Sequence, residues 1–339
     1  MYYDGSKLLS LKDIDGETPT FYLAVSNKTA GKTTYFERLL LNRFFKKGKL
    51  FALLYRFKYQ LSGAADQIER DLNYFFPGHE LTSKQRVKGC YYELYIDKML
   101  CGYAIAINSA DFIKNYSHVF NDVESIFFDE FQSETSHYCE DEIKKFRMIL
   151  TAISRGQGKQ YRYVPVYMAS NPITLLNPYF VAFGIADKIK DDTKFLRGKR
   201  VVVEHNFNES ANSALTESGL IQAFPDREGY GAESTYIKDY VAIVGNAQGK
   251  NKYLCTFKYD GKLYSIREYK DFVYCSDNVD ASYPIKFSVL ATDVQSSLAL
   301  INSNSPLLLY LKECFRIGLF RFKNAQCKKA IFKVVSASV

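Results

Sequence analysis

The chain has 339 residues, of which 47% are apolar and 24% are charged, and it carries a net charge of +8. This composition is that of a folded globular protein and excludes wholesale disorder, while the length favours two domains. No apolar run approaches the ~20 residues that span a membrane, and the N-terminus has no signal-peptide core. The seven cysteines are scattered without a CxxC pair, which fits reduced thiols in a cytosol. The spacing of the four histidines indicates no zinc or iron centre.

Residues 1–205 alternate between apolar runs of strand length and segments with helical spacing. Strands are expected over residues 20–25, 50–57, 102–107, 124–131 and 163–171, and helices over residues 33–47, 64–76 and 140–155. Gly48 would end the first helix and Pro77 the second. Strands that alternate with helices predict an α/β domain, in which helices cover both faces of a mostly parallel sheet.

The character of the sequence changes after residue 205. Residues 206–235 are small, polar and glycine-containing, which predicts a linker or a small helical lid. Residues 236–339 predict a separate, smaller α+β domain. Its expected elements are strands over 240–245 and 271–276, a hairpin over 252–269 that turns at Asp260-Gly261, and a last helix within 306–322 that begins near Pro306.

The excess positive charge is concentrated in the last third of the chain. From Tyr236 onward there are 15 Lys and Arg but only 8 Asp and Glu, whereas the two signs nearly balance in the preceding residues. Such asymmetry indicates a polyanionic partner for that part of the protein. A solvated basic surface is the alternative interpretation.

One loop matches a phosphate-binding motif. It lies between the first predicted strand and the first predicted helix and consists of Ser26, Asn27, Lys28, Thr29, Ala30, Gly31, Lys32 and Thr33. It fits G-x-x-x-x-G-K-[ST] at every fixed position but the first, where serine replaces glycine. In such a loop, backbone N–H groups and the helix N-terminus bind phosphate oxygens. Lys32 would reach the β- and γ-phosphates of a nucleotide, and the Thr33 hydroxyl would bind Mg²⁺.

A predicted buried strand ends in two carboxylates, Asp129 and Glu130. Asp129 would hold the magnesium, directly or through water, and Glu130 would activate the attacking water as a general base. Each motif alone has an ordinary alternative, a plain helix N-terminus or a solvated turn, but their combination favours a Mg²⁺-dependent ATPase. Asn171, which ends a later strand, is placed to sense the γ-phosphate or the water. No Asn-Lys-x-Asp guanine signature is present, so ATP is preferred over GTP.

Six segments carry a resemblance to a known family: AGKT with NRF in residues 30–44, YRFK at 55–58, FFPGHEL at 75–81, SIFFDEF at 125–131, SNPITLLNPYF at 170–180 and GLFRFKN at 318–324. Through them the chain resembles the DNA-packaging motor ATPases of phi29-like tailed phages. These are small relatives of terminase large subunits within the additional-strand, catalytic-glutamate class of P-loop ATPases. The resemblance runs along most of the chain, although Ser26 departs from the family pattern.

This resemblance implies a homomeric ring, typically a pentamer, that docks on the portal vertex of an empty prohead in the host cytoplasm. It also implies that ATP binds between subunits and that a basic residue of one subunit completes the site of the next. The family's trans-acting arginine matches Arg155, and a second basic position matches Lys58 or Arg56. A cation at a helix C-terminus is the alternative for Arg155, and a solvated side chain is the alternative for Lys58.

The kinship with terminases further implies a ribonuclease-H-like fold for residues 236–339. The carboxylates of that region are dispersed and its first predicted strand contains none, so we expect a vestigial nuclease without nuclease activity. Contacts with DNA or a packaging RNA are expected from a cluster of basic residues around the last helix: Arg316, Arg321, Lys323, Lys328 and Lys329. A docking face for the portal, or a solvated surface, would explain the same cluster.

Together these features predict an ATPase that uses ATP and Mg²⁺ to translocate double-stranded DNA into a prohead, with no membrane association. A cellular DNA translocase or helicase would use the same chemistry. A non-hydrolysing nucleic-acid-binding module with a decayed phosphate loop is an alternative from a different class. The presence of Lys32, Thr33, Asp129 and Glu130 argues against such decay.

Overall fold

The computed structural model describes residues 3–134, 137–156, 158, 160–174, 177–186, 188–189, 193–205, 242, 244–288, 299–300, 305–316 and 319–336. The chain divides into two compact units, one formed by Met1–Pro172 with Ala182–Thr235 and the other by Ile173–Val181 with Tyr236–Val339. The predicted linker or lid over residues 206–235 lies outside the described residues. The predicted division into residues 1–205, 206–235 and 236–339 therefore stays a prediction.

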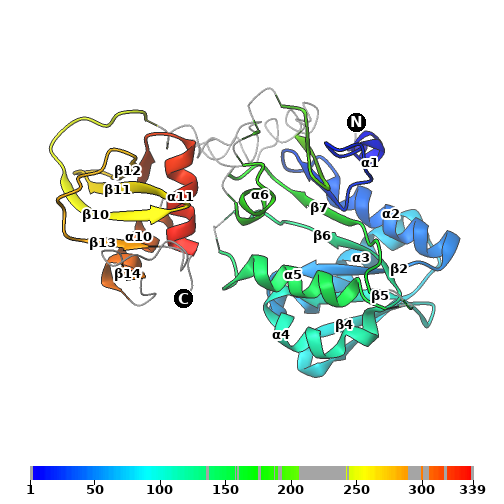
Figure 1. The fold of residues 1–339 in the computed structure, drawn as a ribbon. Coiled ribbons are helices and arrows are strands. Elements are labelled where there is room, and N and C mark those ends of the chain that lie inside the picture. The colour runs from blue at the N-terminus through cyan, green and yellow to red at the C-terminus, as the bar shows by residue number, and fades with distance from the viewer. Residues whose placement is uncertain are drawn as a thin grey trace, which may run out of the picture. The chain divides into compact units, whose positions relative to one another are not determined.

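The first unit is built on a nine-stranded sheet with the strand order β3-β4-β5-β2-β6-β7-β1-β9-β8 (Figure 1). Its strands are β1 Phe21–Val25, β2 Leu50–Tyr55, β3 Leu81–Arg86, β4 Tyr91–Ile96, β5 Met99–Ala106, β6 Val123–Phe128, β7 Val166–Ser170, β8 Phe195–Gly198 and β9 Val201–His205. From β5 to β9 in this order every neighbouring pair is parallel. The prediction of an α/β unit with a mostly parallel sheet is confirmed. Strand β7 lies between β1 and β6 and pairs with both.

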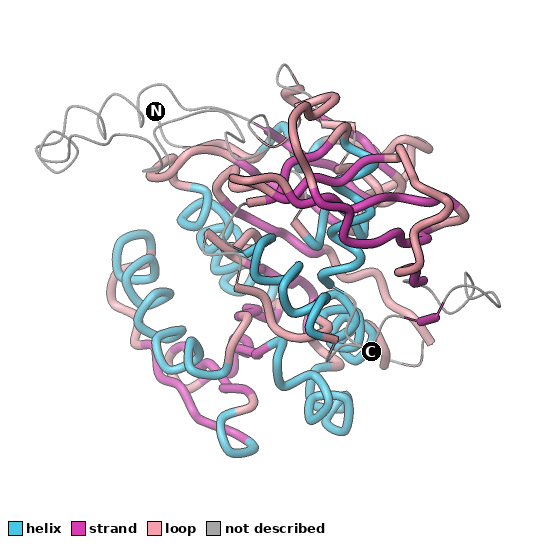
Figure 2. Tube along the Cα trace, turned by 90° about the vertical axis from the view of Figure 1, so that its left-hand side faces the viewer, coloured by secondary structure: helices cyan, strands magenta, loops and turns pink. Residues whose placement is uncertain are grey.

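Helices cover both faces of this sheet. Phe127 packs on Phe36 of α2 (Lys32–Lys47) with 5.4 Å between ring centroids, whereas Phe128 packs on Phe146 of α5 (Glu142–Ile153) at 6.1 Å. Consecutive strand residues point to opposite faces, so α2 and α5 lie on opposite sides of the sheet. The other helices up to residue 183 are α1 Ser6–Ser10, α3 Ala64–Phe75, α4 Ala110–Ile113 and α6 Pro178–Phe183. Figure 2 shows the same chain with helices and strands in separate colours. No helix in the described ranges is long and apolar enough to cross a membrane.

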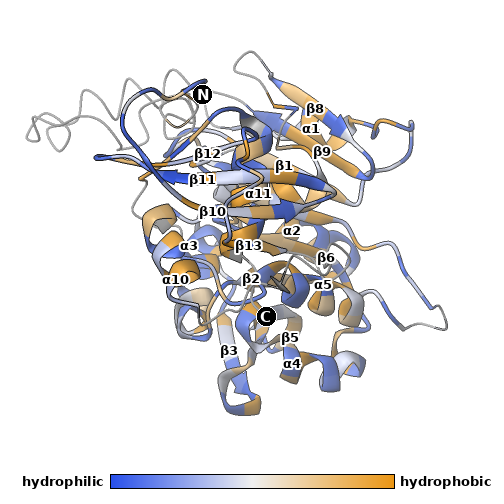
Figure 3. Cartoon of the chain, turned by 60° about the vertical axis from the view of Figure 1, so that its left-hand side comes forward, coloured by the Kyte–Doolittle hydropathy of each residue, from blue (hydrophilic) through white to orange (hydrophobic). Residues whose placement is uncertain are grey.

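Two antiparallel parts of the large sheet are absent from the sequence-based prediction. Strands β3, β4 and β5 form an antiparallel meander at one edge, and β8 pairs antiparallel with β9 at the other. Edge strand β3 has the sequence LTSKQR, of which only Leu81 is buried. It therefore lacks the apolar alternation that marks a strand, and Figure 3 shows β3 as more hydrophilic than the central strand β1. Polar residues on an edge also oppose pairing with other chains.

The second unit has a six-stranded sheet with the order β14-β13-β10-β11-β12-β15. Its strands are β10 Lys252–Tyr259, β11 Lys262–Glu268, β12 Val273–Ser276, β13 Lys286–Ser288, β14 Ala299–Leu300 and β15 Phe320–Phe322. The predicted hairpin is confirmed: β10 and β11 join through Asp260 and Gly261, which have φ angles of 52° and 73° as a tight hairpin turn requires. Strand β11 is antiparallel to both neighbours, whereas the remaining pairs are parallel.

The end of the chain differs from the prediction. The segment 306–322 is not one helix: α10 covers Pro306–Arg316, and Phe320–Phe322 forms β15 beside β12. Phe320 and Phe322 are buried in the core on either side of the partly exposed Arg321, which is the alternation of a strand. A last helix, α11 Ala325–Ser336, packs its apolar side into the same core.

The predicted first strand of this unit is only partly described, so it stays a prediction. Most of the predicted strand over residues 240–245 lies outside the described residues. Of its described members, Ala242 and Val244 exchange backbone hydrogen bonds with Phe322. The first described strand of the sheet is therefore β10, which contains no carboxylate.

Candidate nucleotide site

The predicted phosphate loop follows β1 and leads directly into α2. Gly31 and Thr29 adopt φ angles of 93° and 61°, so the chain turns sharply before the helix begins. Ser26 and Asn27 are buried, and the Ser26 N–H donates to the carbonyl of Ser170 at the end of β7, 3.3 Å away. The first turn of α2 has N–H groups without partners inside the helix, which suits a bound phosphate.

The ammonium of Lys32 lies inside this loop. Its Nζ donates to the carbonyl oxygens of Ser26 and Asn27 over 2.8 and 2.9 Å, and lies 3.4 Å from Oδ1 of Asn171. Burial lowers the pKa of Lys32 to about 8, although the charge of Asp129 opposes this shift. A buried cation surrounded by dipoles would be stabilised by a bound polyanion, so the site fits a polyphosphate.

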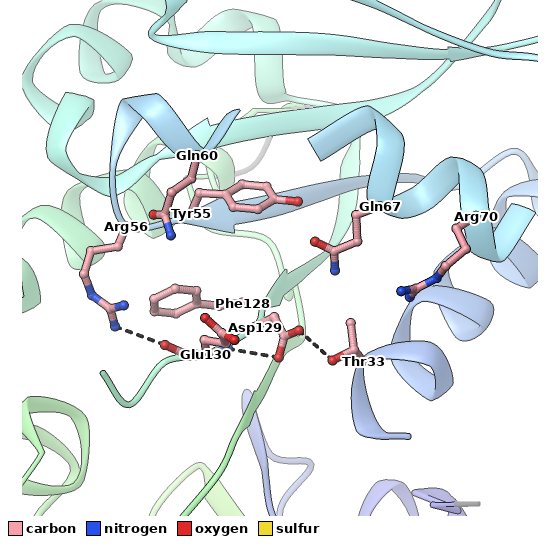
Figure 4. A pocket seen from close by; sticks show the side chains of 9 residues that line it. All are labelled: Thr33, Tyr55, Arg56, Gln60, Gln67, Arg70, Phe128, Asp129 and Glu130. Carbon is pink, nitrogen blue, oxygen red and sulfur yellow. Dashed lines mark hydrogen bonds between the residues drawn. The ribbon is translucent and has the colours of Figure 1, made fainter. Parts of the chain in front are cut away.

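Thr33 and Asp129 are joined by a hydrogen bond, in which the threonine hydroxyl donates to Oδ2 over 2.6 Å (Figure 4). Desolvation raises the pKa of Asp129 to about 6, while the bond from Thr33 opposes the shift. The carboxyl is thus ionised at neutral pH. Mg²⁺ prefers oxygen ligands and usually retains several waters, so one hydroxyl and one carboxylate side by side fit this ion.

Glu130 follows Asp129 in an unusual backbone conformation. Its φ angle is 52°, in the left-handed region that residues with a Cβ rarely adopt, and its N–H donates to Oδ1 of Asp129 over 2.9 Å. Strained backbone of this kind is concentrated at functional sites. The Glu130 side chain is exposed, on the wall of a cavity.

Arg56, directly after β2, holds this strained segment. Its Nη2 donates to the carbonyl oxygens of Glu130 and Phe131 over 3.2 and 2.8 Å, and its Nε donates to the Glu142 carboxylate over 3.0 Å. Arg56 is 6% exposed and its partners belong to its own chain, so it is not available to a neighbouring subunit. Lys58, the other basic position that the resemblance offered, is exposed.

A third acidic residue, Glu134, contacts both the phosphate loop and Asn171. Its carboxylate forms an ion pair with Lys28 of the phosphate loop at 2.9 Å and accepts a hydrogen bond from Nδ2 of Asn171 at 3.0 Å. Asn171 therefore lies between Lys32 and Glu134, as a residue that senses the phosphates would. Glu134 could not be predicted from the sequence, because it lies in a loop without a recognisable pattern.

A cavity of about 430 Å³ opens beside these residues. It is lined by Thr33, Tyr55, Arg56, Gln60, Gln67, Arg70, Phe128, Asp129 and Glu130. Figure 4 shows Gln67 and Arg70 of α3 on the side of Thr33, and Gln60 and Tyr55 above Glu130. Polar side chains from outside the two motifs thus face the carboxylates. Their roles could not be predicted, because polar positions on a helix usually indicate only its solvent-exposed side.

One buried carboxyl group lies between α2 and α3. Glu37 is 1% exposed, accepts a hydrogen bond from Gln67, and lies beside Asp71, which is 4% exposed. Burial, followed by the charge of Asp71 and a hydrogen bond with it, raises the pKa of Glu37 to about 9. The Glu37 side chain is thus protonated at neutral pH, beside Asp71 of the neighbouring helix.

We expect this buried carboxyl to make stability depend on pH. Because the pKa of Glu37 is higher in the folded protein than its ordinary value of 4.5, the folded state binds more protons between these values. The free energy of unfolding therefore falls as pH rises above 4.5, by up to about 1.4 kcal/mol per pH unit. Glu37→Gln should remove this dependence and raise the melting temperature at pH 8 more than at pH 5.

Chemical unfolding at pH 5 to 9 measures this effect. Glu69→Gln on the exposed side of α3 is the matched control, because it removes a carboxyl group that water solvates. A pH dependence that is the same in Glu37→Gln and in the wild-type protein would contradict the raised pKa of Glu37.

Arg155 and Lys58 lie at the surface of the first unit. Arg155 follows the C-terminus of α5 and is exposed, and Lys58 begins a short 3₁₀ helix after β2 and is also exposed. Exposure is what a residue that reaches a neighbouring subunit requires, and it is equally what a solvated cation shows. Their roles stay predictions.

The predicted basic cluster of the second unit divides by burial. Arg321 and Lys329 are partly exposed, and Lys323 pairs with Asp277 at 2.6 Å while keeping 34% of its side chain exposed. The prediction that Lys328 belongs to a basic surface is corrected, because this residue is only 6% exposed. Burial lowers the pKa of Lys328 to about 7. Its side chain lies against the Phe322 ring and so does not present a charge to a surface ligand. The Arg316 side chain lies outside the described residues.

Comparison with known proteins places this geometry in a family. The family model of the Podovirus DNA encapsidation protein (Gp16) matches residues 1–338. A DNA packaging protein of Bacillus phage phi29 is 22% identical over 342 residues, which cover 98% of this chain and 97% of that protein.

Solved structures show a similar fold over the whole chain. A structure of the phi-28 DNA packaging motor has a TM-score of 0.65 at 16% identity and covers 99% of this chain and 97% of its own. The bacteriophage phi-29 genome packaging motor assembly has a TM-score of 0.57 at 22% identity, with coverage of 98% and 99%. Because the family model matches almost every residue, the chain belongs to the podovirus DNA encapsidation proteins.

Proposed function

We propose that the protein is an ATP-driven motor that translocates double-stranded viral DNA into a preformed prohead. The observation that carries this proposal is the convergence of Lys32, Thr33 and Asp129 at one edge of the large sheet, in a chain of the encapsidation family. The family favours this function over a cellular helicase. The buried ammonium and the hydroxyl–carboxylate pair favour it over a module that has lost nucleotide binding.

The residues of the site would divide the reaction among them. Lys32 and the N–H groups of the loop would bind the β- and γ-phosphates of ATP, and Thr33 and Asp129 would hold Mg²⁺. The magnesium ion neutralises charge on the phosphate oxygens when it is bound. Glu130 would take a proton from the attacking water, in a position fixed by Arg56. Asn171 would orient the water or sense the γ-phosphate.

The strand order supports the additional-strand, catalytic-glutamate class for the first unit. Strand β1 leads into the phosphate loop and β6 leads into Asp129 and Glu130, and β7 is inserted between them. An additional strand at this position and a glutamate after the magnesium-binding aspartate are the two features for which this class is named.

We propose that the active form is a ring of identical subunits, a pentamer by family resemblance, that binds the portal vertex and a packaging RNA. ATP would be bound at subunit interfaces, where Arg155 and Lys58 of one subunit would complete the site of the next. The exposed positions of both residues support this assignment. The motor would act in the host cytoplasm while attached to the prohead.

The second unit is proposed to bind nucleic acid with a ribonuclease-H-like fold that has lost nuclease activity. Five neighbouring strands lie in the spatial order β12-β11-β10-β13-β14, and β11 is antiparallel to both of its neighbours, which supports this fold. Its first described strand, β10, contains no carboxylate, and Asp277 is paired with Lys323. Metal-dependent cleavage of DNA by the purified protein would contradict the loss of nuclease activity.

Packaging into empty proheads tests the proposed function. Purified protein with ATP and Mg²⁺ should protect a full-length DNA from added nuclease, and duplex DNA should stimulate ATP hydrolysis. Stimulation of ATP hydrolysis without prohead-dependent protection would favour a helicase. Absence of ATP hydrolysis under both conditions would favour a non-hydrolysing module.

We expect Arg321 and Lys329 to contribute phosphate contacts in the second unit. Each lost contact should lower the slope of log affinity against log salt concentration by about 1, because fewer counterions are released. Titration of duplex DNA into Arg321→Ala and Lys329→Ala at several salt concentrations measures this slope. Lys46→Ala, at an exposed lysine of α2, is the control. Unchanged slopes would remove both residues from the nucleic-acid site.

A further inference from the structure

The backbone around Arg155 is held by groups that the nucleotide site does not use. Arg162 is 7% exposed, and one of its guanidinium nitrogens, Nη2, donates to the carbonyl of Ile153, the last residue of α5, over 2.9 Å. The same nitrogen donates to the carbonyl of Val123 at the start of β6 over 3.0 Å. The backbone N–H of Arg162 donates to the carbonyl of Ser154 over 2.7 Å.

Asn121 holds the other side of the same turn. With its amide oriented so that Nδ2 donates, this nitrogen lies 3.1 Å from the carbonyl of Arg155 and 3.1 Å from that of Ser117. Gly156 has a φ angle of 112°, and a Cβ at this position would lie 2.5 Å from Cγ of Asn121. Only glycine fits so close to the asparagine in this conformation.

The carbonyls of three consecutive residues, 153 to 155, therefore accept hydrogen bonds from Arg162 or Asn121, and Gly156 lies close against Asn121. The carbonyl groups at the end of a helix have no partners within it, and here a buried guanidinium and an amide supply them. Fixing these carbonyls determines where α5 ends and in which direction the Arg155 side chain leaves the surface. A buried guanidinium with several donors suits this purpose, because its planar shape permits little movement.

We propose that Arg162 and Asn121 form a socket that positions Arg155 for insertion into the neighbouring subunit's nucleotide site. This inference rests on the proposed trans action of Arg155, and it names the residues that fix the position of the Arg155 side chain. Arg162 is a positioning residue, because it acts through the backbone beside Arg155. Val123, its other partner, lies at the opposite end of β6 from Asp129, so the subunit's own phosphate site does not depend on this contact.

The socket predicts a defect that is confined to one side of the subunit interface. Displacement of a reacting group by about 1 Å can cost on the order of 10²-fold in rate. Arg162→Gln motors should thus hydrolyse ATP about 10²-fold more slowly while retaining ATP binding. A subunit with this substitution should place its own Arg155 badly in the neighbouring subunit's site. Its own nucleotide site should still be completed normally by the Arg155 of an unsubstituted neighbour.

Motors assembled on proheads from mixed, differently tagged subunits separate these two roles. The reference mixture combines Arg155→Ala with Lys32→Ala subunits, and recovery of ATP hydrolysis there establishes sharing. Arg162→Gln should recover activity when mixed with Lys32→Ala, whose Arg155 and socket are intact. It should not recover when mixed with Arg155→Ala, because neither subunit then offers a well-placed arginine.

Each outcome decides the proposal. No recovery in the reference mixture overturns the trans action of Arg155 and the socket with it. Recovery there but not for Arg162→Gln with Lys32→Ala means that Arg162 serves its own site, which overturns the socket alone. Recovery for Arg162→Gln with Arg155→Ala also overturns it, since the substituted subunit then donates normally.

Two further variants, Asn121→Ala and Arg162→Lys, and one control, Arg147→Gln, distinguish the proposed defect from a loss of folding. Asn121→Ala removes the two hydrogen bonds of a partly exposed amide, those to Arg155 and Ser117, and should show the same one-sided defect at about tenfold. Arg162→Lys keeps one donor and should be less impaired than Arg162→Gln. Arg147→Gln, at an exposed arginine of α5, should behave as the wild-type protein in every mixture. A defect of Asn121→Ala as acceptor would overturn the proposal.

Discussion

Glu130→Gln should leave ATP bound and nearly abolish its hydrolysis. Glutamine keeps the size of the side chain, so Lys32, Thr33 and Asp129 can still hold the nucleotide and the metal. Only the group that accepts the proton of the attacking water is lost, and general bases contribute about 10²–10⁴-fold in rate. Single-turnover hydrolysis of labelled ATP, together with equilibrium binding of a fluorescent ATP analogue, measures both quantities.

Two other variants serve as comparisons for Glu130→Gln. Lys32→Ala should lose nucleotide binding as well as turnover, because it removes the buried positive charge from the loop. Glu140→Gln removes an exposed carboxylate just before α5 and should have little effect. If Glu130→Gln hydrolysed ATP within a few-fold of the wild-type rate, Glu130 would not be the general base.

The residues of the nucleotide site differ in how well the sequence predicts them. Lys32, Thr33, Asp129 and Glu130 belong to short motifs at the ends of buried strands, and parallel strands bring their carboxyl ends to one edge. Their meeting at one edge could thus be predicted before the structure. Glu134 could not, since its contact with Lys28 depends on the path of a loop.

Arg56 shows a second limit of sequence analysis. A basic residue after a strand can point into solvent, toward a neighbour or back into the protein, and sequence spacing does not distinguish these. The structure shows it buried against Glu142, which lies 86 positions later. Tertiary partners at that separation leave no local pattern, and the same is true of the burial of Glu37 beside Asp71.

The fold could be predicted where burial imposes a period on the sequence. The central strands β1, β2 and β6 are buried on both sides and appear as apolar runs. The edge strand β3 is exposed and polar, so nothing in its sequence separates it from a loop. In the second unit, a short strand follows a helix closely, and the apolar residues of Phe320–Phe322 extended the helical pattern of α10 past its true end.

Arg155→Ala should lower ATP hydrolysis by about 10³–10⁵-fold, the range in which arginine fingers act, with nucleotide binding retained. The expectation rests on three features of the residue. It is exposed, it follows the end of α5, and its backbone carbonyl accepts a hydrogen bond from Asn121. If Arg155 served only as a cation at a helix C-terminus, its loss would cost about 0.3–1 kcal/mol of stability and leave hydrolysis unchanged.

The two explanations therefore differ by orders of magnitude in rate. Steady-state ATP hydrolysis on proheads distinguishes them, with the melting temperature measured alongside. Arg155→Lys keeps the charge but not the planar fork, so it should restore helix stability fully and hydrolysis only in part. Wild-type hydrolysis by Arg155→Ala would assign the residue to the helix terminus and leave the exposed Lys58 as the remaining candidate for completing a neighbour's site.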